Sequence, residues 1–255
     1  MKELLEAGVH IGHTVERWNP KMKKFVYGTK EGIHIIDIIK TLRYLHYACT
    51  FLQSAATVNK SILFVGTKST ASEVVPLASK ECNAFYIKQR WLGGFLTNWC
   101  TMKKCIQKLQ QLDNDLPTQA AHHKDGNIND ESGILSEVVQ RKSTHHVSRQ
   151  KQALPWGLTK KEVLALKKQQ MRLTKFFGGV KGMNERPDIV IILGQNEESN
   201  AVHECVKLQI PNITIVDTDC DPELADYPIP ANDDSFRSIH IILQKLVQAY
   251  KSPFT

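Results

Sequence analysis

Short apolar runs rich in β-branched residues alternate with longer amphipathic segments over most of this chain. The segments between the runs predict helices at about 40–58, 69–82 and 197–208, with a last helix from Asp233 to about Tyr250. The runs themselves predict strands, at 33–38 (IHIIDI), 61–66 (SILFVG), 84–88 (AFYIK), 188–193 (DIVIIL) and 213–217 (ITIVD). Near-continuous apolar strands separated by helices are typical of a parallel sheet covered on both faces. The predicted fold class is therefore α/β, with a parallel five-stranded sheet and flanking helices.

The alternation stops between the third and fourth runs, where about a hundred residues intervene. Two helices are predicted at the ends of this gap. The first begins at Thr97 and repeats apolar residues at steps of three and four, at Trp99, Met102, Ile106 and Leu109. The second opens with a capping box from Thr159 to Glu162 and carries one apolar stripe, at Leu166, Leu173 and Phe177. Two narrow apolar stripes predict an antiparallel helical hairpin with a coiled-coil-like seam. We expect this hairpin to protrude as an arm, with a long polar insertion at about 113–157.

The net charge of +7 hides a strong segregation of charge along the chain. Residues 141–181 contain eleven lysines or arginines and one acid, a net charge of +10, whereas residues 182–234 contain twelve acids and two bases, a net charge of −10. Residues 17–30 add five bases and no acid. Clustered bases are typical of a polyanion-binding surface, because each neutralised phosphate releases counterions and strengthens binding. Solvated helix faces are the alternative, so charge alone leaves nucleic acid as one of two interpretations.

Composition argues against two classes of protein. The longest apolar runs, such as 189–193, are far shorter than the ~20 residues that a membrane helix requires, so no membrane partner is expected. Six cysteines without paired spacing predict free thiols in a reducing compartment rather than a disulfide framework. The N-terminal stretch MKELLEAGVH resembles neither a signal segment nor an import peptide. We therefore expect a soluble chain that is made where it works or is already processed.

Three motifs could carry chemistry, and each has a simpler interpretation. Residues 10–13 spell HIGH, as in class I aminoacyl-tRNA synthetases, but here the tetrapeptide precedes every predicted strand and is treated as a coincidence. GTKST at 66–70 follows a strand and opens a helix, so its amides could hold an anion; it matches no nucleotide fingerprint, and a tight turn is favoured. VDTDCDP at 216–222 puts three aspartates after a strand, where carboxylates could hold magnesium; a turn stabilised by aspartate side chains is favoured. We predict no metal, no cofactor and no small-molecule substrate.

Two stretches interleave tryptophan with basic residues, RWNPKMKKF at 17–25 and KQRWLGGFLTNW at 88–99. Aromatic rings can stack on nucleobases while neighbouring cations contact phosphate. Anchoring of a loop to its domain is the competing role for each tryptophan and is favoured, whereas the basic neighbours are the better candidates for RNA contact. In the second stretch a glycine pair permits a sharp turn from strand to helix.

Motifs along nearly the whole chain outside 113–157 resemble one protein family. They include EAGVHIGH (6–13), RWNPKM (17–22), RWLGGFLTNW (90–99), FFGGVKGM (176–183) and IPANDD (229–234). In their order and wording they resemble the S2 family of small-subunit ribosomal proteins, in its bacterial and organellar form and most closely in its plastid members. The resemblance implies a flavodoxin-like (Rossmann-like) α/β domain with a protruding helical hairpin.

The resemblance also implies a function and partners. It implies a structural constituent of the small ribosomal subunit, between head and body, that supports translation and is not an enzyme. Its partners would be small-subunit rRNA and neighbouring ribosomal proteins, including the large mRNA-binding ribosomal protein where one is present. Its location would be the ribosome of an organelle, with the plastid stroma first and a mitochondrion or the bacterial cytoplasm as alternatives. The chain would divide into an RNA-contacting segment with the first part of the α/β domain (1–95), the arm with its insertion (96–178) and the second part of the α/β domain (179–255).

The site prediction combines this resemblance with residue types. RNA contact is predicted in the two tryptophan stretches and on both arm helices, at Arg17, Trp18, Asn19, Lys21, Lys23, Lys24, Lys88, Arg90, Trp91, Thr97, Asn98, Lys103, Lys104, Lys160, Lys161, Lys167, Lys168 and Arg172. Structural turns are predicted at Gly93, Gly94, Gly178 and Gly179. Thr97 is expected to cap the first arm helix, and Trp91 and Trp99 to wedge the arm against the domain. The alternative, from the enzyme class, is a nucleotide-dependent enzyme that uses GTKST and the VDTDCDP loop.

Overall fold

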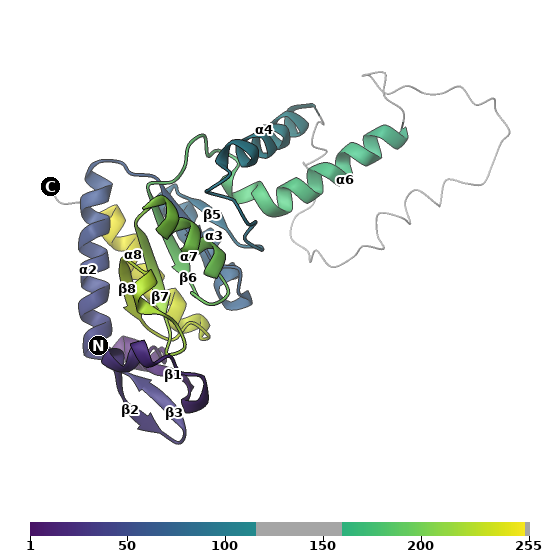
Figure 1. The fold of residues 1–255 in the computed structure, drawn as a ribbon. Helices are drawn as coiled ribbons and strands as arrows, with labels where there is room; N and C mark the ends of the chain where they lie inside the picture. The colour runs from purple at the N-terminus through teal and green to yellow at the C-terminus, as the bar shows by residue number, and fades with distance from the viewer. Residues whose placement is uncertain (116–159, 253–255) are drawn as a thin grey trace, which may run out of the picture. The chain divides into compact units, whose positions relative to one another are not determined.

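The computed structural model describes residues 1–115 and 160–252, so Thr159 and nearly all of the predicted insertion lie outside the described residues. The chain divides into two compact units, which are considered separately below. One unit consists of Met1–Leu109 with Leu173–Thr255, and the other of Gln110–Arg172. The first unit contains every described strand and most of the described helices (Figure 1).

Five strands of the first unit form a parallel sheet in the order β5-β4-β6-β7-β8. They are β4 (Ile62–Val65), β5 (Phe85–Ile87), β6 (Ile189–Leu193), β7 (Asn212–Val216) and β8 (Tyr227–Pro230). Of these five strands, β4 comes first in the chain. The next, β5, lies on one side of β4 at the edge of the sheet, and β6 lies on its other side, which is the order of flavodoxin-like folds. The predicted α/β class with a five-stranded parallel sheet is confirmed. Strand order runs one way from β4 to β5 and the opposite way from β6 to β8. This reversal of strand order places a topological switch point between the carboxyl ends of β4 and β6.

One face of the parallel sheet packs against three helices. Successive side chains of a strand point to opposite faces, so Phe64 and Ile191 belong to the same layer. They pack with apolar residues of α2 (Ile38–Thr57), α3 (Ser69–Cys82) and α8 (Phe236–Lys251). The spans of α2 and α3 follow the predicted helices closely. Because the strands are apolar on both faces, a second layer must cover the other side.

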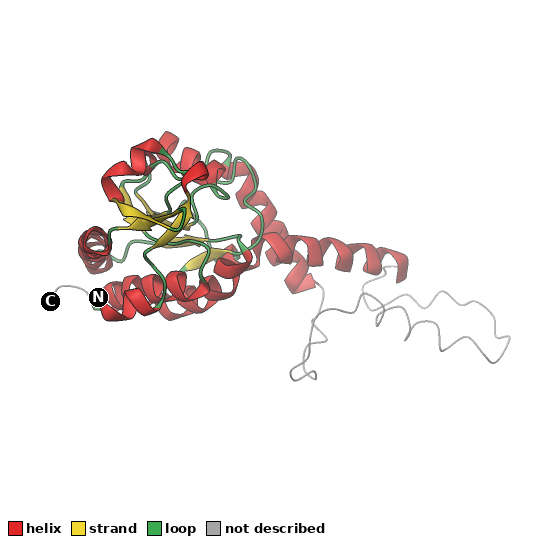
Figure 2. Ribbon diagram, turned by 90° about the horizontal axis from the view of Figure 1, so that it is seen from below, coloured by secondary structure: helices red, strands yellow, loops and turns green. Residues whose placement is uncertain are grey.

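The other face packs against α7 (Ser199–Leu208) and against the sheet-proximal ends of α4 (Trp99–Asp115) and α6 (Lys160–Phe177). Leu63 and Ile192 contribute to this second core, together with buried residues from the segment between β5 and α4. The strands therefore lie between two helical layers (Figure 2). This arrangement explains why the central strands read as continuous apolar runs in the sequence.

The run at 33–38 does not join the parallel sheet, which corrects the first of the five predicted strands. Its residues Ile33–Ile36 form β3, the central strand of an antiparallel sheet with β1 (Ile11–Thr14) and β2 (Val26–Lys30). Histidine and aspartate interrupt the run, so it lacks the continuous apolar character of a fully buried strand. Asp37 instead begins α2, since its Oδ1 accepts a hydrogen bond from the Ile39 amide (3.0 Å).

The fifth parallel strand is β8, which the sequence analysis did not predict. Pro228 and Pro230 lie within it, and proline cannot donate a ladder hydrogen bond. That chemistry argues against a central strand, and the structure places β8 at the edge of the sheet. Between β7 and β8 lies the short 3-10 helix η4 (Pro222–Leu224).

The antiparallel sheet is attached to the carboxyl end of β7 by a small third core. Met22 and Phe25, from the 3-10 helix η2 (Pro20–Phe25), pack with Val216 and Cys220. The Asn19 amide donates to the Thr218 carbonyl (2.8 Å). The N-terminal segment, purple in Figure 1, is thereby fixed beside the strand ends of the parallel sheet.

Residues of α4 and α6 meet within each of the two units. In the first unit, Ile106 of α4 and Phe177 of α6 share one core. In the second unit, Gln170 Nε2 donates to Asp113 Oδ1 (2.5 Å). The predicted hairpin agrees with these contacts, and its protrusion as an arm stays a prediction. The capping role of Thr159 lies outside the described residues.

Candidate nucleic-acid interface and the buried carboxylates beside it

One carboxylate, that of Glu204 on α7, holds the segment between β5 and α4. Its Oε1 accepts hydrogen bonds from Trp91 Nε1 (3.0 Å) and the Gly94 amide (2.7 Å). Its Oε2 accepts from the Leu96 and Thr97 amides (2.8 and 2.9 Å) and from the Thr97 hydroxyl (3.2 Å). Five donors thus converge on a side chain that is 8% exposed. We call residues 91–97 the anchored loop.

The backbone of the anchored loop depends on Gly94, whose φ is +83°. Residues with a Cβ rarely adopt this conformation, whereas glycine does so readily. Gly93 is exposed, and a Cβ there would meet open space. Of the glycine pair, it is therefore Gly94 that the turn requires. Asn98 is exposed at the end of the turn, and its backbone N–H donates to the Gly94 carbonyl (2.8 Å).

Two residues of the anchored loop that were predicted to contact RNA bind Glu204 instead; Trp91 is buried and Thr97 is half-buried. Trp91 is 5% exposed, donates to Glu204 and lies with its ring centroid 5.0 Å from that of Phe95. Thr97 donates both its amide and its hydroxyl to Glu204, and α4 begins only at Trp99. RNA contact by either residue stays a prediction, whereas the predicted capping role of Thr97 is wrong, because α4 begins two residues later. Trp91 anchors the loop, which was the favoured alternative.

Glu204 is ionised at neutral pH. Burial alone would raise the pKa of its carboxyl, but the hydrogen bonds from the loop outweigh burial and hold the pKa below its usual value of 4.5. The sequence analysis missed this residue. The available signal was its position on α7, where Ala201 and Cys205 belong to the same buried face. A carboxylate on an apolar helix face requires hydrogen-bond donors from elsewhere in the fold.

The basic residues that flank the anchored loop are exposed. Lys88 and Arg90 precede it, and neither forms an ion pair among the described residues. On the first turns of α4, Lys104 is exposed and Lys103 is half-buried. Among residues 1–115 and 160–252, no carboxylate forms an ion pair with these four cations, so they are in a position to meet an external polyanion.

The N-terminal tryptophan stretch divides into engaged and exposed residues. Trp18 is half-buried, with its ring centroid 5.0 Å from that of His34. Asn19 Oδ1 accepts from the Lys21 amide (3.0 Å) and so caps η2. Lys21 Nζ lies 2.7 Å from Asp221 and 2.6 Å from Glu223.

RNA contact by Lys21 stays a prediction, and the pairing means that two carboxylates of the chain itself already lie against its ammonium group. Asn19 likewise has its side-chain oxygen engaged as a cap. The remaining bases of the stretch, Arg17, Lys23 and Lys24, are exposed. Lys24 also lies over the ring of Phe25, with Nζ 5.1 Å from the centroid.

The predicted bases of the second arm helix lie along α6. Lys161, Lys167, Lys168 and Arg172 are exposed, and Lys160 is the first residue of the helix. Of the two glycines that follow α6, Gly178 is exposed, whereas Gly179 packs against β5. A Cβ at Gly179 would overlap the backbone oxygen of Tyr86. Close approach of two backbones therefore requires glycine at 179.

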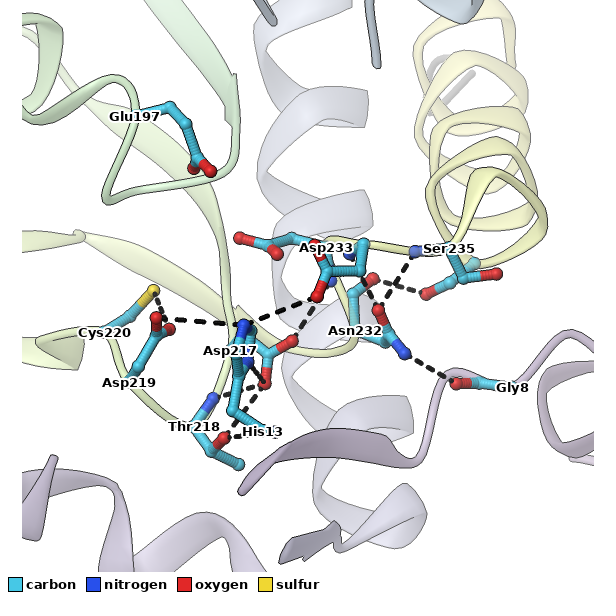
Figure 3. Close-up of polar contacts among 12 residues, drawn as sticks. Gly8, His13, Glu197, Asp217, Thr218, Asp219, Cys220, Asn232, Asp233 and Ser235 are labelled. Carbon is cyan, nitrogen blue, oxygen red and sulfur yellow. Dashed lines mark hydrogen bonds and ion pairs between the residues drawn. The ribbon is translucent and has the colours of Figure 1, made fainter. Parts of the chain in front are cut away.

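A second group of charged residues lies at the carboxyl ends of β6 and β7 (Figure 3). His13, from β1, places Nδ1 3.2 Å from Asp217 Oδ1 and Nε2 3.4 Å from Asp234 Oδ2. Asp219 Oδ2 is 3.9 Å from the same Nε2. The contact with Asp217, supported by the other two carboxylates and opposed by burial, raises the pKa of His13 to about 9. His13 is thus an imidazolium at neutral pH.

Lys68 supplies the second cation of this group. Its Nζ lies 2.6 Å from Asp234 Oδ1, 2.9 Å from Asp233 Oδ1 and 3.5 Å from Glu197 Oε1. Asp233 is 2% exposed, and burial together with the nearby charge of Asp217 raises the pKa of its carboxyl to about 6, although Lys68 opposes the shift. The sequence analysis did not bring His13 or Lys68 to these aspartates, because they come from distant segments.

Three residues of this group could hold a cation. His13, Asp217 and Asp233 each offer one ligand atom, and these atoms lie within 4.8 Å of one another. Neutral imidazole and carboxylate are suitable ligands for a divalent ion such as Zn²⁺, so binding would require His13 to lose its proton. Their convergence was not evident from the sequence, and the absence of a metal stays a prediction.

The geometry gives no support to the nucleotide-dependent enzyme. At the GTKST turn the Thr67 amide donates to Glu198 Oε1 (2.7 Å), so a carboxylate of the chain occupies a donor that a phosphate would need. Lys68 of the same turn is paired with three carboxylates. In the VDTDCDP segment, Asp221 Oδ1 accepts from the Glu223 amide (3.1 Å), as expected for a turn stabilised by aspartate. Both motifs therefore serve internal structure.

Helices long and apolar enough to cross a membrane are absent from the described part of the chain. The fold and these sites define a doubly wound α/β protein in which the charged residues at the strand ends contact one another, whereas Lys88 and Arg90 are exposed.

Comparison with known proteins identifies the family. The chain matches Ribosomal protein S2 over residues 4–136 and 124–252. It is 44% identical over 249 residues to small ribosomal subunit protein uS2c of Mesostigma viride, covering 98% of this chain and 94% of the relative. It is 44% identical over 246 residues to uS2c of Euglena gracilis (96% and 88% covered) and 41% identical over 249 residues to uS2 of Picosynechococcus sp. (98% and 84% covered). The chain belongs to the ribosomal protein S2 family; it is a structural constituent of the small ribosomal subunit and not an enzyme.

Proposed function

We propose that this chain attaches to small-subunit rRNA through three groups of basic residues and acts in the ribosome of a plastid. The groups are the N-terminal bases (Arg17, Lys23 and Lys24), the bases beside the anchored loop (Lys88, Arg90, Lys103 and Lys104) and the bases of α6 (Lys160, Lys161, Lys167, Lys168 and Arg172). Family membership and the segregation of charge support this proposal. Phosphate contacts by such residues fix position and orientation on RNA.

The observation that carries the proposal is the contrast between paired and unpaired cations. Lys21, Lys68 and His13 lie against carboxylates. Lys88 and Arg90, by contrast, are exposed beside a loop whose backbone is fixed. Cations on a rigid support lose little conformational freedom when they meet phosphate, so they suit an RNA contact.

The test is the affinity of the purified chain for plastid small-subunit rRNA over a series of KCl concentrations. The double variant Lys88→Gln with Arg90→Gln should weaken binding and reduce the slope of log affinity against log salt by about one per lost phosphate contact. A matched control, Lys80→Gln with Arg237→Gln, removes one exposed lysine and one exposed arginine from α3 and α8. Equal behaviour of the two double variants would contradict the proposed contact.

The partners and location require a separate measurement. Several relatives named uS2c support the plastid, with a mitochondrion or a bacterial cytoplasm as the alternatives. We infer further that neighbouring ribosomal proteins contact this chain, including the large mRNA-binding ribosomal protein where one is present. Sedimentation of a plastid lysate through sucrose should place the chain with small subunits at low salt. Its presence at the top of the gradient at low salt would contradict this assignment.

A further inference from the structure

The contacts of Glu204 concern the shape of the proposed RNA contact rather than its charge. The anchored loop lies between two exposed groups, Lys88 with Arg90 on one side and Asn98 with α4 on the other. Its conformation therefore determines where both groups lie relative to the sheet. Besides the backbone hydrogen bonds from Phe95 to Leu92 and from Asn98 to Gly94, the loop is held by donors that meet at one carboxylate.

Only an ionised glutamate fits these donors. A carboxylate offers two oxygens with about four lone-pair directions. These can serve the indole and the three backbone amides, and the Thr97 hydroxyl, at 3.2 Å, shares Oε2 with two of the amides. Glutamine would keep one oxygen and place an NH₂ group, itself a donor, against the amides of the loop. Aspartate would keep the charge but is one methylene shorter, so it cannot reach both sides of the loop.

The charge of Glu204 cannot itself attract RNA, because a carboxylate repels phosphate. Its benefit to an RNA contact must come from the arrangement of the loop. If Glu204 were merely a nearby charge, its neutralisation would strengthen binding. If it arranges the loop, the same neutralisation weakens binding. The sign of the change in RNA affinity when Glu204 is neutralised therefore distinguishes the two roles.

We propose that Glu204 is a positioning residue for RNA attachment: by holding Trp91, Gly94, Leu96 and Thr97, it sets the direction in which Lys88 and Arg90 meet phosphate. This inference rests on the proposed rRNA contact. It assigns to a buried residue of α7, about a hundred positions away in the sequence, a function in the loop after β5.

The experiment compares Glu204→Gln with Glu198→Gln in the full chain. Glu198 is a matched control, since it is also a buried glutamate and accepts from a backbone amide, that of Thr67, outside the anchored loop. Binding to plastid small-subunit rRNA is measured over a KCl series, at a temperature where circular dichroism shows each variant folded. Glu204→Gln should weaken binding by about tenfold and reduce the salt slope by one to two, as Lys88→Gln with Arg90→Gln does. Glu198→Gln should leave both quantities unchanged.

A double-mutant cycle supplies the readout that a general loss of stability would not change. In the background of Lys88→Gln with Arg90→Gln, Glu204→Gln should add less than about twofold, because the cations that it positions are gone. An equally large further loss in that background, or unchanged binding by Glu204→Gln alone, would overturn the inference. If Lys88→Gln with Arg90→Gln binds as the unmodified chain does, the proposed contact itself fails.

A milder variant serves if Glu204→Gln does not fold. Trp91→Phe keeps an aromatic ring in the core and removes one donor from Glu204 Oε1. It should weaken binding by about threefold. It should also speed hydrogen exchange at the Gly94, Leu96 and Thr97 amides, because their acceptor, the Glu204 carboxylate, is then held less firmly. Slow exchange at these amides together with weakened binding would show that the effect does not pass through the loop, contrary to the proposal.

Discussion

Glu204 and Asp233 are both buried carboxylates of the same α/β unit, yet their surroundings act on them in opposite directions. Glu204 meets five neutral hydrogen-bond donors, and its pKa lies below the usual value. Asp233 meets Lys68 but also the carboxylate of Asp217, and its pKa is raised to about 6. Burial opposes ionisation at both sites. The difference arises from whether the neighbours are donors or like charges.

The comparison teaches that burial of a charge does not by itself show what the charge does. At Glu204 the negative charge is distributed over loop amides that have no other hydrogen-bond acceptor in the described part of the chain, so the carboxylate and the loop require each other. At Asp233 the charges are redundant, because Lys68 retains Asp234 and Glu197 if Asp233 is lost. We therefore expect large effects at the first site and small effects at the second.

Glu204→Ala should give the largest effect. It leaves buried amides and an indole without an acceptor, so the free energy of unfolding should fall by about 3 kcal/mol or more. Urea denaturation followed by tryptophan fluorescence would measure it. The exposed Glu73→Ala on α3 is a suitable control and should change stability by less than about 0.5 kcal/mol. A loss below about 1 kcal/mol for Glu204→Ala would remove the basis of the comparison.

Gly94→Val should rank second. Valine at a φ of +83° is strained, while a Cβ at this position meets Asn98 Cβ only at 3.5 Å, so backbone strain dominates the cost. We expect a loss of about 2 kcal/mol and lower incorporation of the chain into small subunits, since the loop leads directly into α4. Urea denaturation and sucrose-gradient sedimentation would measure the two effects. Normal incorporation would show that the direction of α4 does not depend on this turn.

The pH dependence of stability should sharpen the comparison further. The folded pKa of Glu204 is depressed, so its contribution is complete above its unfolded pKa of about 4.5 and is lost as the pH falls through the folded value. The difference in unfolding free energy between the unmodified chain and Glu204→Gln should therefore shrink below about pH 4.5. Urea titrations at pH 7, 5, 4 and 3 would measure it. A difference that stays constant over this range would mean that the carboxylate is not the stabilising form.

Asp233→Asn should give the smallest effect. The substitution removes repulsion from Asp217 and one contact to Lys68, two changes of opposite sign. Asparagine also keeps the shape of the side chain. Stability at pH 7 should change by less than about 1 kcal/mol in either direction. Thermal unfolding compared with the unmodified chain would measure it, and a loss as large as that of Glu204→Ala would erase the contrast between the two sites.

Much of the fold was predictable from the sequence because parallel strands covered on both faces require continuous apolar residues. Four of the five predicted strands lie in the parallel sheet, and α3 has the predicted bounds. The failures occurred where that rule does not apply. The run at 33–38 is half-polar and pairs in the antiparallel sheet, and β8 contains two prolines that an edge strand tolerates.

The candidate site was predictable only in part. Exposure of Lys88 and Arg90 agrees with what their chemistry indicated, since unpaired cations avoid the interior. Lys21, Trp91 and Thr97 were assigned to RNA from residue type, but each has partners far away in the sequence. Local composition cannot reveal such partners, because a lysine beside a tryptophan looks the same whether or not a distant aspartate lies against it.

The sequence by itself determined the class of fold, the segregation of charge and the family. These depend on periodicity, composition and motif order, all of which are local or additive along the chain. The tertiary structure decided which charged side chains pair with other residues of the chain and which stay exposed to a partner. Glu204 with the anchored loop, and Lys68 and His13 with the aspartates after β7, are pairings between segments that only folding brings together. Electrostatic and hydrogen-bond energies act over a few ångströms, so their outcome depends on the fold and not on sequence distance.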